Sequence, residues 1–390
     1  MSNDTQPEIR FPGFTEAWKQ RKLGEVSKIG DIDHRMPPSV DDGIPYLMTG
    51  DFIEENELNF ENTKLVSEDD YLQLSKKIRP EYGDILFARY ASVGAVRYVS
   101  THRKFLISYS CAIIKPFSDI DGQFLYPTLK TQKMQQKIEF EINPNSQKNI
   151  GIDSLKKLPL FIPKMDEQQK IGTFFKQLDD TIALHQRKLD LLKETKKGFL
   201  QKMFPKNGAK VPEIRFPGFT ENWEEKKFKE VINSGIKGKA KAEMSGTKSL
   251  YLDTNYLNGG VVTYVDSPRD VENDDVLILW DGSQAGTVYY GFSGALGSTL
   301  KAYRAKESGA FLYQQLKRNQ QIIYDRYRTP NIPHVVKTFT DEFMVSMPSS
   351  EEQNKIGAFF KQLDDTIALH QRKLDLLKET KKGFLQKMFV

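Results

Sequence analysis

One segment of this chain is written twice, and that repetition constrains the fold more than any other feature. Residues 174–204 read FFKQLDDTIALHQRKLDLLKETKKGFLQKMF, and residues 359–389 repeat them letter for letter. A shorter motif, EIRFPGFTE, begins at Glu8 and again at Glu213, and a Trp follows it closely both times. Internal repeats of this kind indicate one structural unit used twice. The chain therefore runs through a short entry motif, a variable segment and a long repeat, and then through the same series again.

The long repeat predicts a coiled-coil helix, because its apolar residues recur at alternating spacings of four and three. Asp166 and Ser350, each three residues before a Gln, are the expected helix N-caps. His185 and His370 fall on the apolar seam and are interpreted as core or register residues, since no second type of metal ligand accompanies them. The predicted seam consists of Ile171, Phe175, Leu178, Ile182, Leu189, Leu192, Ile356, Phe360, Leu363, Ile367, Leu374 and Leu377.

Connectivity predicts how these helices pair. The first helix leads from one variable segment to the other, so a partner packed against it has to run back, antiparallel. The entry motif at residues 213–223 follows the end of the first helix, and the antiparallel pairing would place residues 8–18 at the end of the second. We therefore expect Phe11, Phe14 and Trp18 to be apolar anchors of a joint, and the two termini to lie close together.

The variable segments predict two copies of one mixed fold. Strand-forming runs at residues 83–100 and 275–291 align, with Asp84 on Asp275 and, after one extra residue, Gly94 on Gly286. The expected fold class is α/β (α+β), with two globular domains separated by a long antiparallel two-helix coiled coil, related by pseudo-twofold symmetry. The predicted segments are residues 1–165 (first domain, entry motif 8–18), 166–204 (first helix), 205–348 (second domain, entry motif 213–223) and 349–390 (second helix).

Composition limits the class of protein. No run of eighteen apolar residues exists, so a membrane span is not expected, and the single cysteine, Cys111, fits a reducing cytoplasm. The net charge is +5, but residues 19–165 carry 21 basic and 20 acidic side chains and residues 224–348 carry 16 and 15. A nucleic-acid partner would therefore need a local basic patch rather than a basic domain.

Motifs for catalysis are missing from the sequence. It contains no GxxxxGK[ST], no GxGxxG, no CxxC and no HExxH. We expect no catalytic residue, no metal and no cofactor bound by this chain itself.

Polar loop residues are the candidates for reading DNA, because base edges and phosphates are contacted by Arg, Lys, Asn, Gln and Ser. Ordinary polar loops are the alternative for any one of them. Two candidate groups, NSQKN and TPNIPH, fall at matching places shortly before each long repeat. The candidates are Lys76, Lys77, Arg79, Arg89, Tyr90, Ser92, Asn145, Ser146, Gln147 and Lys148 in the first domain, and Lys248, Tyr251, Trp280, Ser283, Gln284, Arg328, Asn331 and His334 in the second.

With its two entry motifs, its EQQKIG and EQNKIG runs and its duplicated long repeat, the chain resembles the specificity subunit of type I restriction–modification systems, and staphylococcal members most of all. The likeness covers essentially the whole chain. It implies that each domain reads one half of a bipartite double-stranded DNA target. It also implies two modification subunits that methylate adenine with S-adenosylmethionine, and restriction subunits that use ATP and Mg to cleave DNA.

Two other functions remain open on sequence grounds. The chain could be a non-catalytic scaffold with two protein-binding domains on a spacer, or an enzyme whose active site has no recognisable motif. Salt-sensitive DNA binding separates the first of these from a specificity subunit. Turnover by the isolated chain would identify the second.

Overall fold

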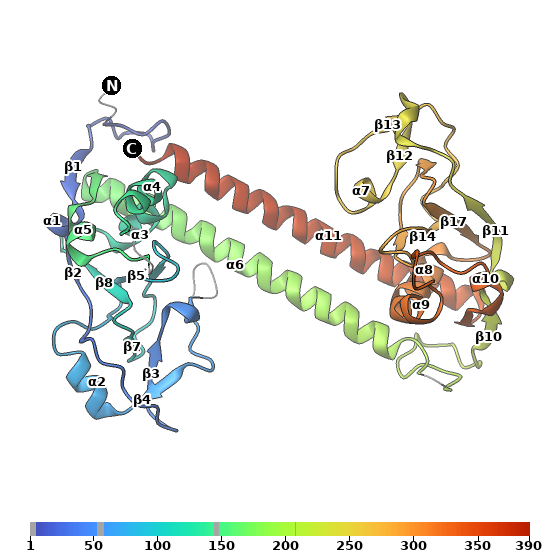
Figure 1. The fold of residues 1–390 in the computed structure, drawn as a ribbon, viewed down its shortest axis with the longest axis horizontal. Coiled ribbons are helices and arrows are strands. Elements are labelled where there is room, and N and C mark those ends of the chain that lie inside the picture. The colour runs from blue at the N-terminus through green and yellow to red at the C-terminus, as the bar shows by residue number, and fades with distance from the viewer. Residues whose placement is uncertain (1–4, 53–57, 144–147, 207) are drawn as a thin grey trace. The chain divides into compact units, whose positions relative to one another are not determined.

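The chain folds into two compact units, and each unit contains part of both long helices. The computed structural model describes residues 5–52, 58–143, 148–206 and 208–390. Unit 1 comprises Met1–Gln186 and Arg372–Val390, and unit 2 comprises Arg187–Gln371. The predicted segments divided the chain into domains and helices, whereas each compact unit combines one domain with segments of the two helices (Figure 1).

Unit 1 begins with the first entry motif and is built mainly from short strands. Its elements are β1 (Lys19–Lys22), α1 (Leu23–Val26), β2 (Ser27–Gly30), β3 (Ile44–Leu47), η1 (Thr49–Asp51), β4 (Lys64–Val66), α2 (Glu68–Leu74), β5 (Ile85–Ala88), β6 (Val96–Tyr98), β7 (Leu106–Ile107), β8 (Cys111–Pro116), α3 (Gly122–Lys130), α4 (Gln132–Phe140), α5 (Ile152–Lys157) and β9 (Pro159–Ile162). The first long helix, α6 (Met165–Lys202), starts here and ends in unit 2.

Unit 2 repeats the order of the strands. It contains β10 (Glu224–Lys227), η2 (Phe228–Glu230), β11 (Ile232–Lys237), η3 (Ala242–Met244), β12 (Ser245–Leu252), α7 (Thr254–Leu257), β13 (Tyr264–Val265), β14 (Val276–Leu279), β15 (Val288–Tyr290), β16 (Ala295–Leu296), β17 (Leu300–Ala305), α8 (Gly309–Arg318), α9 (Gln320–Arg326), α10 (Phe339–Glu342) and β18 (Met344–Met347). The second long helix, α11 (Ser350–Lys387), starts here and ends in unit 1.

The sheets of the two units have the same topology. Unit 1 has a four-stranded sheet in the order β2-β8-β5-β6, a three-stranded sheet β4-β3-β7 and the pair β1-β9. Unit 2 has β11-β17-β14-β15, β13-β12-β16 and β10-β18. In both three-stranded sheets one pairing is antiparallel and the other is parallel. The prediction that the two variable segments share one fold is confirmed.

The alignment of the two central strands also holds in atomic detail. The carboxylate of Asp84 accepts a hydrogen bond from Glu81 N at 2.7 Å, and that of Asp275 accepts one from Glu272 N at 2.9 Å. Gly94 and Gly286 both have left-handed backbone conformations, with φ of +93° and +98°. A residue with a side chain would be strained there, so glycine is required at the same turn twice.

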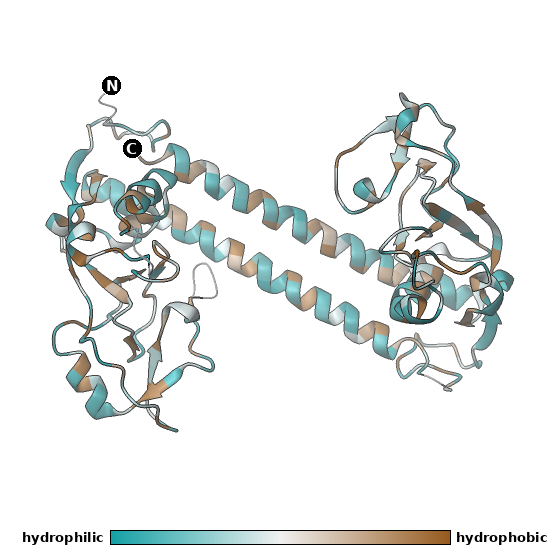
Figure 2. Cartoon of the chain, viewed as in Figure 1, coloured by the Kyte–Doolittle hydropathy of each residue, from teal (hydrophilic) through white to brown (hydrophobic). Residues whose placement is uncertain are grey.

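The long helices begin and end at equivalent residues of the repeat. Asp166 and Ser350 lie inside the first turn, so their predicted role as N-caps is wrong, and in α11 the hydroxyl of Ser349 instead accepts a hydrogen bond from Glu352 N at 3.4 Å. All twelve predicted seam residues are buried or half-buried. Figure 2 shows apolar and polar bands alternating along both helices. No helix in the described part of the chain is long and apolar enough to cross a membrane.

Within each unit the two helix segments run antiparallel. In unit 1, Phe174 of α6 contacts Phe384 of α11 with ring centroids 5.0 Å apart. In unit 2, Phe199 of α6 contacts Phe359 of α11 at 5.1 Å. Phe174 and Phe359 occupy one position of the repeat, and Phe199 and Phe384 occupy another. Each unit therefore contains one phenylalanine from each position.

The entry motifs pack where the two helices end. Ile9 N donates to Lys387 O in unit 1, and Ile214 N donates to Lys202 O in unit 2, both at 2.9 Å. The Trp18 ring lies edge-on to Phe389 at 6.3 Å, and Trp223 lies edge-on to Phe204 at 5.9 Å. The expected joint is therefore present in both units, and in unit 1 it brings the described N-terminal residues beside the end of α11 (Figure 1).

A buried ion pair, which the sequence analysis missed, fixes each joint further. Arg10 donates hydrogen bonds to both carboxylate oxygens of Glu167, at 2.6 and 2.7 Å, and Arg215 does the same to Glu352 at 2.7 Å each. Both glutamates are almost fully buried. The bidentate geometry suits an arginine and would not be reproduced by a lysine.

Candidate nucleic-acid interface

The candidate interface lies where the central strand of each unit ends. In unit 1 the chain leaves β5 through Arg89 and Tyr90, and an isolated antiparallel bridge joins Tyr90 to Asn149. In unit 2 the chain leaves β14 through Trp280 and Asp281, and the same kind of bridge joins Asp281 to His334. The polar segments that precede the two long helices therefore meet the ends of the central strands at matching positions.

Backbone hydrogen bonds make this equivalence close. Arg89 N donates to Ser110 O at 2.9 Å, and Arg89 O accepts from Ile150 N at 3.1 Å. Trp280 N donates to Thr299 O at 2.7 Å, and Trp280 O accepts from Val335 N at 2.9 Å. Arg89 and Trp280 thus occupy one backbone position in two copies of the fold, with unrelated side chains.

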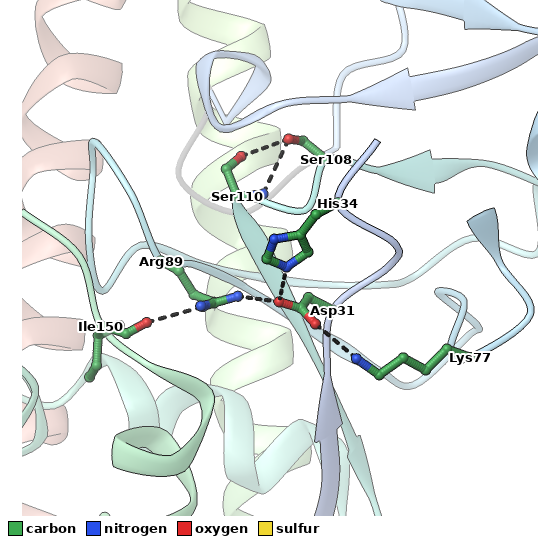
Figure 3. Close-up of polar contacts among 7 residues, drawn as sticks. All are labelled: Asp31, His34, Lys77, Arg89, Ser108, Ser110 and Ile150. Atoms are coloured by element: carbon green, nitrogen blue, oxygen red, sulfur yellow. Dashed lines mark hydrogen bonds and ion pairs between the residues drawn. The ribbon is translucent and has the colours of Figure 1, made fainter. Parts of the chain in front are cut away.

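In unit 1 a buried carboxylate organises the polar side chains at this position (Figure 3). Asp31 follows β2 and is 5% exposed. Its carboxylate pairs with Arg89, hydrogen-bonds to His34 at 3.0 Å and pairs with Lys77 at 3.2 Å. Burial favours a higher pKa of Asp31, but the hydrogen bonds from His34 and Lys77 and the charge of Arg89 outweigh it, so the pKa is lowered. Asp31 is therefore held as an anion.

Arg89 itself needs a correction. It was predicted to contact DNA directly, but it is 6% exposed, because it donates through Nη1 to Asp31 and through Nε to Ile150 O at 3.0 Å. It instead ties the strand end to the segment before α5. The side chains that reach solvent from this cluster are Lys77 and His34, and the His34 ring stacks on Tyr109 at a centroid distance of 5.0 Å.

The other first-unit candidates are distributed around this cluster. Lys76 and Ser92 are exposed, Tyr90 is half-buried under the Arg89 guanidinium, and Arg79 is engaged with Glu81 at 3.0 Å. Lys148 is exposed, whereas Asn145, Ser146 and Gln147 lie outside the described residues.

In unit 2 the predicted loop residues come together. Arg328 Nη1 donates to Ser283 O at 3.1 Å, and Gly282 N donates to Pro333 O at 2.9 Å. The hydroxyl of Thr329 lies 3.0 Å from His334 Nδ1, which closes the loop. Five of the predicted residues, Ser283, Gln284, Arg328, Asn331 and His334, therefore belong to two loops that are hydrogen-bonded to each other.

Three other second-unit candidates lie differently. Trp280 is 5% exposed, so it was wrongly predicted as a direct contact, and Lys301 Nζ lies 3.4 Å from the centroid of its ring. Tyr251 is buried on β12, and burial raises its pKa, so it too is corrected to a core residue. Lys248 is exposed on the same strand, in a different sheet from β14.

The sequence analysis missed Asp31 and His34 in unit 1 and Lys237 and Lys301 in unit 2. Residue type alone did not single them out, because Asp31 pairs with Arg89 across 58 positions of the sequence and Lys237 pairs with Asp281 across 44. The described residues contain no cluster of His, Cys, Asp or Glu that could hold a metal ion. The surface offers positive charge and hydrogen-bonding groups, which are the means by which proteins contact a polyanion.

A sequence model of the family described as the type I restriction modification DNA specificity domain matches residues 15–194 and 220–379. The chain belongs to this family. Each matched stretch covers one variable segment and most of the long helix that follows it.

Two relatives of this specificity family come from Methanocaldococcus jannaschii. The type I restriction enzyme MjaVIII specificity subunit is 30% identical over 195 residues, which covers 47% of this chain and 44% of that protein. The match therefore spans less than half the length of that relative. The putative type I restriction enzyme MjaX specificity subunit is 23% identical over 342 residues, which covers 79% and 78%.

A solved structure shares the whole fold. The type I restriction–modification S subunit from M. genitalium aligns over 99% of both chains with a TM-score of 0.72, at 18% sequence identity. At this identity the likeness shows the fold alone.

Proposed function

We propose that this specificity subunit recognises a bipartite double-stranded DNA target, with one half read by each unit. The observation that carries the proposal is the duplicated strand end. The same hydrogen-bonded frame positions Tyr90 and Asn149 in unit 1 and Asp281 and His334 in unit 2. Two units that recognise different base sequences can share one backbone fold but need different side chains, because side-chain donors and acceptors distinguish the base edges.

We propose further that the two long helices set the gap between the half-sites and recruit two modification subunits. Exposed leucines support this role. Leu184 and Leu369 occupy equivalent positions of the repeat, as do Leu191 and Leu376, and each is at least 60% exposed. Large apolar side chains at recurring surface positions indicate a protein contact, and two copies of the contact fit two modification subunits.

The chemistry would then belong to the partners. In this proposal S-adenosylmethionine is bound by the modification subunits, which methylate adenine, and ATP and Mg are used by restriction subunits that join the complex. The chain itself supplies sequence recognition and assembly.

The test is to co-express the chain with a modification subunit and to map methylated bases in the host DNA. We expect adenine methylation at a two-part motif with a fixed gap. A properly assembled complex that methylates no such motif contradicts the proposal. A scaffold without DNA recognition predicts in addition that binding to duplex DNA is absent or unrelated to sequence.

A further inference from the structure

Two lysines of unit 2 face each other across neighbouring strands. In the antiparallel pairing of β11 with β17, Lys237 is the partner of Lys301. Side chains at partnered positions lie on the same face of a sheet and close together, so two like charges there oppose folding. Such an arrangement persists when another group offsets the charge or when function requires it.

The groups around Lys301 do not neutralise it. Its ammonium lies over the Trp280 ring, 3.4 Å from the centroid, and is half-buried. The one carboxylate that offsets its charge, Asp281, is engaged in an ion pair with Lys237. Among the described residues, no carboxylate forms an ion pair with Lys301 itself.

The pKa of Lys301 reflects this surplus of positive charge. Burial lowers it first, and the charges of Lys237 and Lys337 lower it further, while Asp281 acts in the opposite direction. The charges of Lys237 and Lys337 thus both act on Lys301, and a half-buried cation without an ion-pair partner costs folding free energy.

The lysines lie at the same strand end as the proposed base-reading loops. Trp280 and Asp281 follow β14 directly, Asp281 bridges to His334, and Lys337 follows three residues later. A contact to the DNA backbone is expected beside base contacts, because phosphate contacts set the register in which the bases are read.

We propose that Lys237, Lys301 and Lys337 form a binding site for one backbone phosphate of the second half-site. This inference rests on the proposed function, since it names the DNA group that unit 2 holds. The Trp280 ring supports the Lys301 ammonium from one side by a cation–π contact, and the phosphate completes its surroundings from the other. Lys237 and Lys337 add the remaining positive charge.

The site belongs to unit 2 alone. The sheet registers place Lys301 opposite Ile278 of β14, and the equivalent pair in unit 1 is Ala112 opposite Phe87. Unit 1 therefore has a fully buried alanine, Ala112, where unit 2 has Lys301. Removing the Lys301 charge should therefore act through one half-site only.

The test uses the full chain in complex with a modification subunit and the duplex identified by methylation mapping. Lys301→Met keeps the alkyl contact with Trp280 and removes the charge, and Lys337→Met is the second variant. Lys226→Met is the matched control, because it removes one charge from β10 in the same unit, where Lys226 pairs with Glu224. Thermal melting checks that each variant is folded.

Affinity is measured as a function of KCl concentration. Loss of one phosphate contact lowers the slope of log K against log salt by about 0.9. We expect this decrease for Lys301→Met, together with a weakening that is the same for the intact duplex and for duplexes altered in either half. A loss confined to certain base pairs would make Lys301 a base reader, and a slope like that of Lys226→Met would remove it from the interface. Either result overturns the proposal.

A methylphosphonate scan locates the phosphate. Neutralising one linkage in the second half-site should weaken the wild-type complex and the Lys226→Met control, and should have a smaller effect on Lys301→Met, which has already lost one of the three lysines at that phosphate. Inorganic phosphate and chloride at equal ionic strength should inhibit equally. A stronger effect of inorganic phosphate that disappears in Lys301→Met would make a free anion the ligand and overturn the assignment to DNA. Failure of the wild-type complex to bind any bipartite duplex would instead contradict the proposed function itself.

Discussion

Lys381 Nζ lies 2.6 Å from Asp179 Oδ1 in unit 1, and both side chains are largely buried. In unit 2 the same ion pair is made by Lys196 and Asp364 at 2.5 Å. Asp179 and Asp364 are one position of the repeat, and Lys196 and Lys381 are another. Each copy of the helix therefore contributes its Asp to one unit and its Lys to the other.

Asp179→Asn should destabilise unit 1 by about 3–5 kcal/mol, because it removes the carboxylate that pairs with the largely buried Lys381 ammonium. Unfolding in urea, followed by Trp18 fluorescence in a background with the other two tryptophans replaced by Phe, measures this effect. Asp364→Asn is the matched control and should leave the Trp18 transition in place. The exchange Asp179→Lys with Lys381→Asp should recover part of the loss, and no recovery would mean that the ion pair is not the cause.

Asp31→Asn should remove a pH-dependent part of the stability of unit 1. The folded-state pKa of Asp31 is lowered relative to its ordinary value near ~3.9, so the native state binds fewer protons than the unfolded state. The contribution is fully present above that ordinary pKa and is lost as the pH falls through the lowered folded pKa. Urea unfolding between pH 7 and pH 3 should show wild type and Asp31→Asn converging at the acidic end. Asp33→Asn, at an exposed neighbouring position, controls for the change in charge.

Phe389→Ala should destabilise unit 1 by about 3–5 kcal/mol, as expected for the loss of a buried aromatic ring. Phe389 is 4% exposed and contacts Trp18, Phe124 and Phe175. The equivalent change in unit 2, Phe204→Ala, removes the contacts with Trp223 and Phe311. Hydrogen exchange read by mass spectrometry should show loss of protection in one unit for each variant. Equal loss in both units for either variant would contradict the assignment.

Exchange of residues 19–165 for the matching domain of a relative should change one half of the methylated motif and leave the other half intact. The reason is that the frame is shared and the side chains at the strand end differ. Sequencing of methylated bases gives the answer directly. Relaxed recognition of both halves would show that the units do not read independently.

Insertion of a heptad-scale block into α6 should change the gap between the two halves without changing their sequences. An insertion of seven residues preserves the apolar seam, and an insertion of five residues, which shifts the seam, is the control that should abolish assembly. The gap is read from the same methylation map. An unchanged gap with an intact complex would exclude the helices as the spacer.

The repetition allowed the fold to be predicted to a large extent. Identical helices with an apolar seam and an entry motif that follows one helix required the joint now seen at Trp18 and Trp223. The side chains at the strand ends were harder to predict, because residue type does not reveal burial. Arg89 was predicted to contact DNA, but it pairs with the carboxylate of Asp31, which lies 58 residues away in the sequence. Lys301 gained its significance only from the register that places it opposite Lys237.

The division of the chain into units bears on how the protein folds as it is synthesised. Residues 187–371 contain all of unit 2, but unit 1 needs Arg372–Val390, which the ribosome makes only after unit 2. At about 5–20 residues per second, the first unit waits roughly 10–40 s for the segment that carries Phe389. During that interval the core around Trp18 lacks part of its packing. The second unit in the sequence is therefore the first that can complete itself, and chaperones should meet the nascent chain mainly through the unfinished first unit.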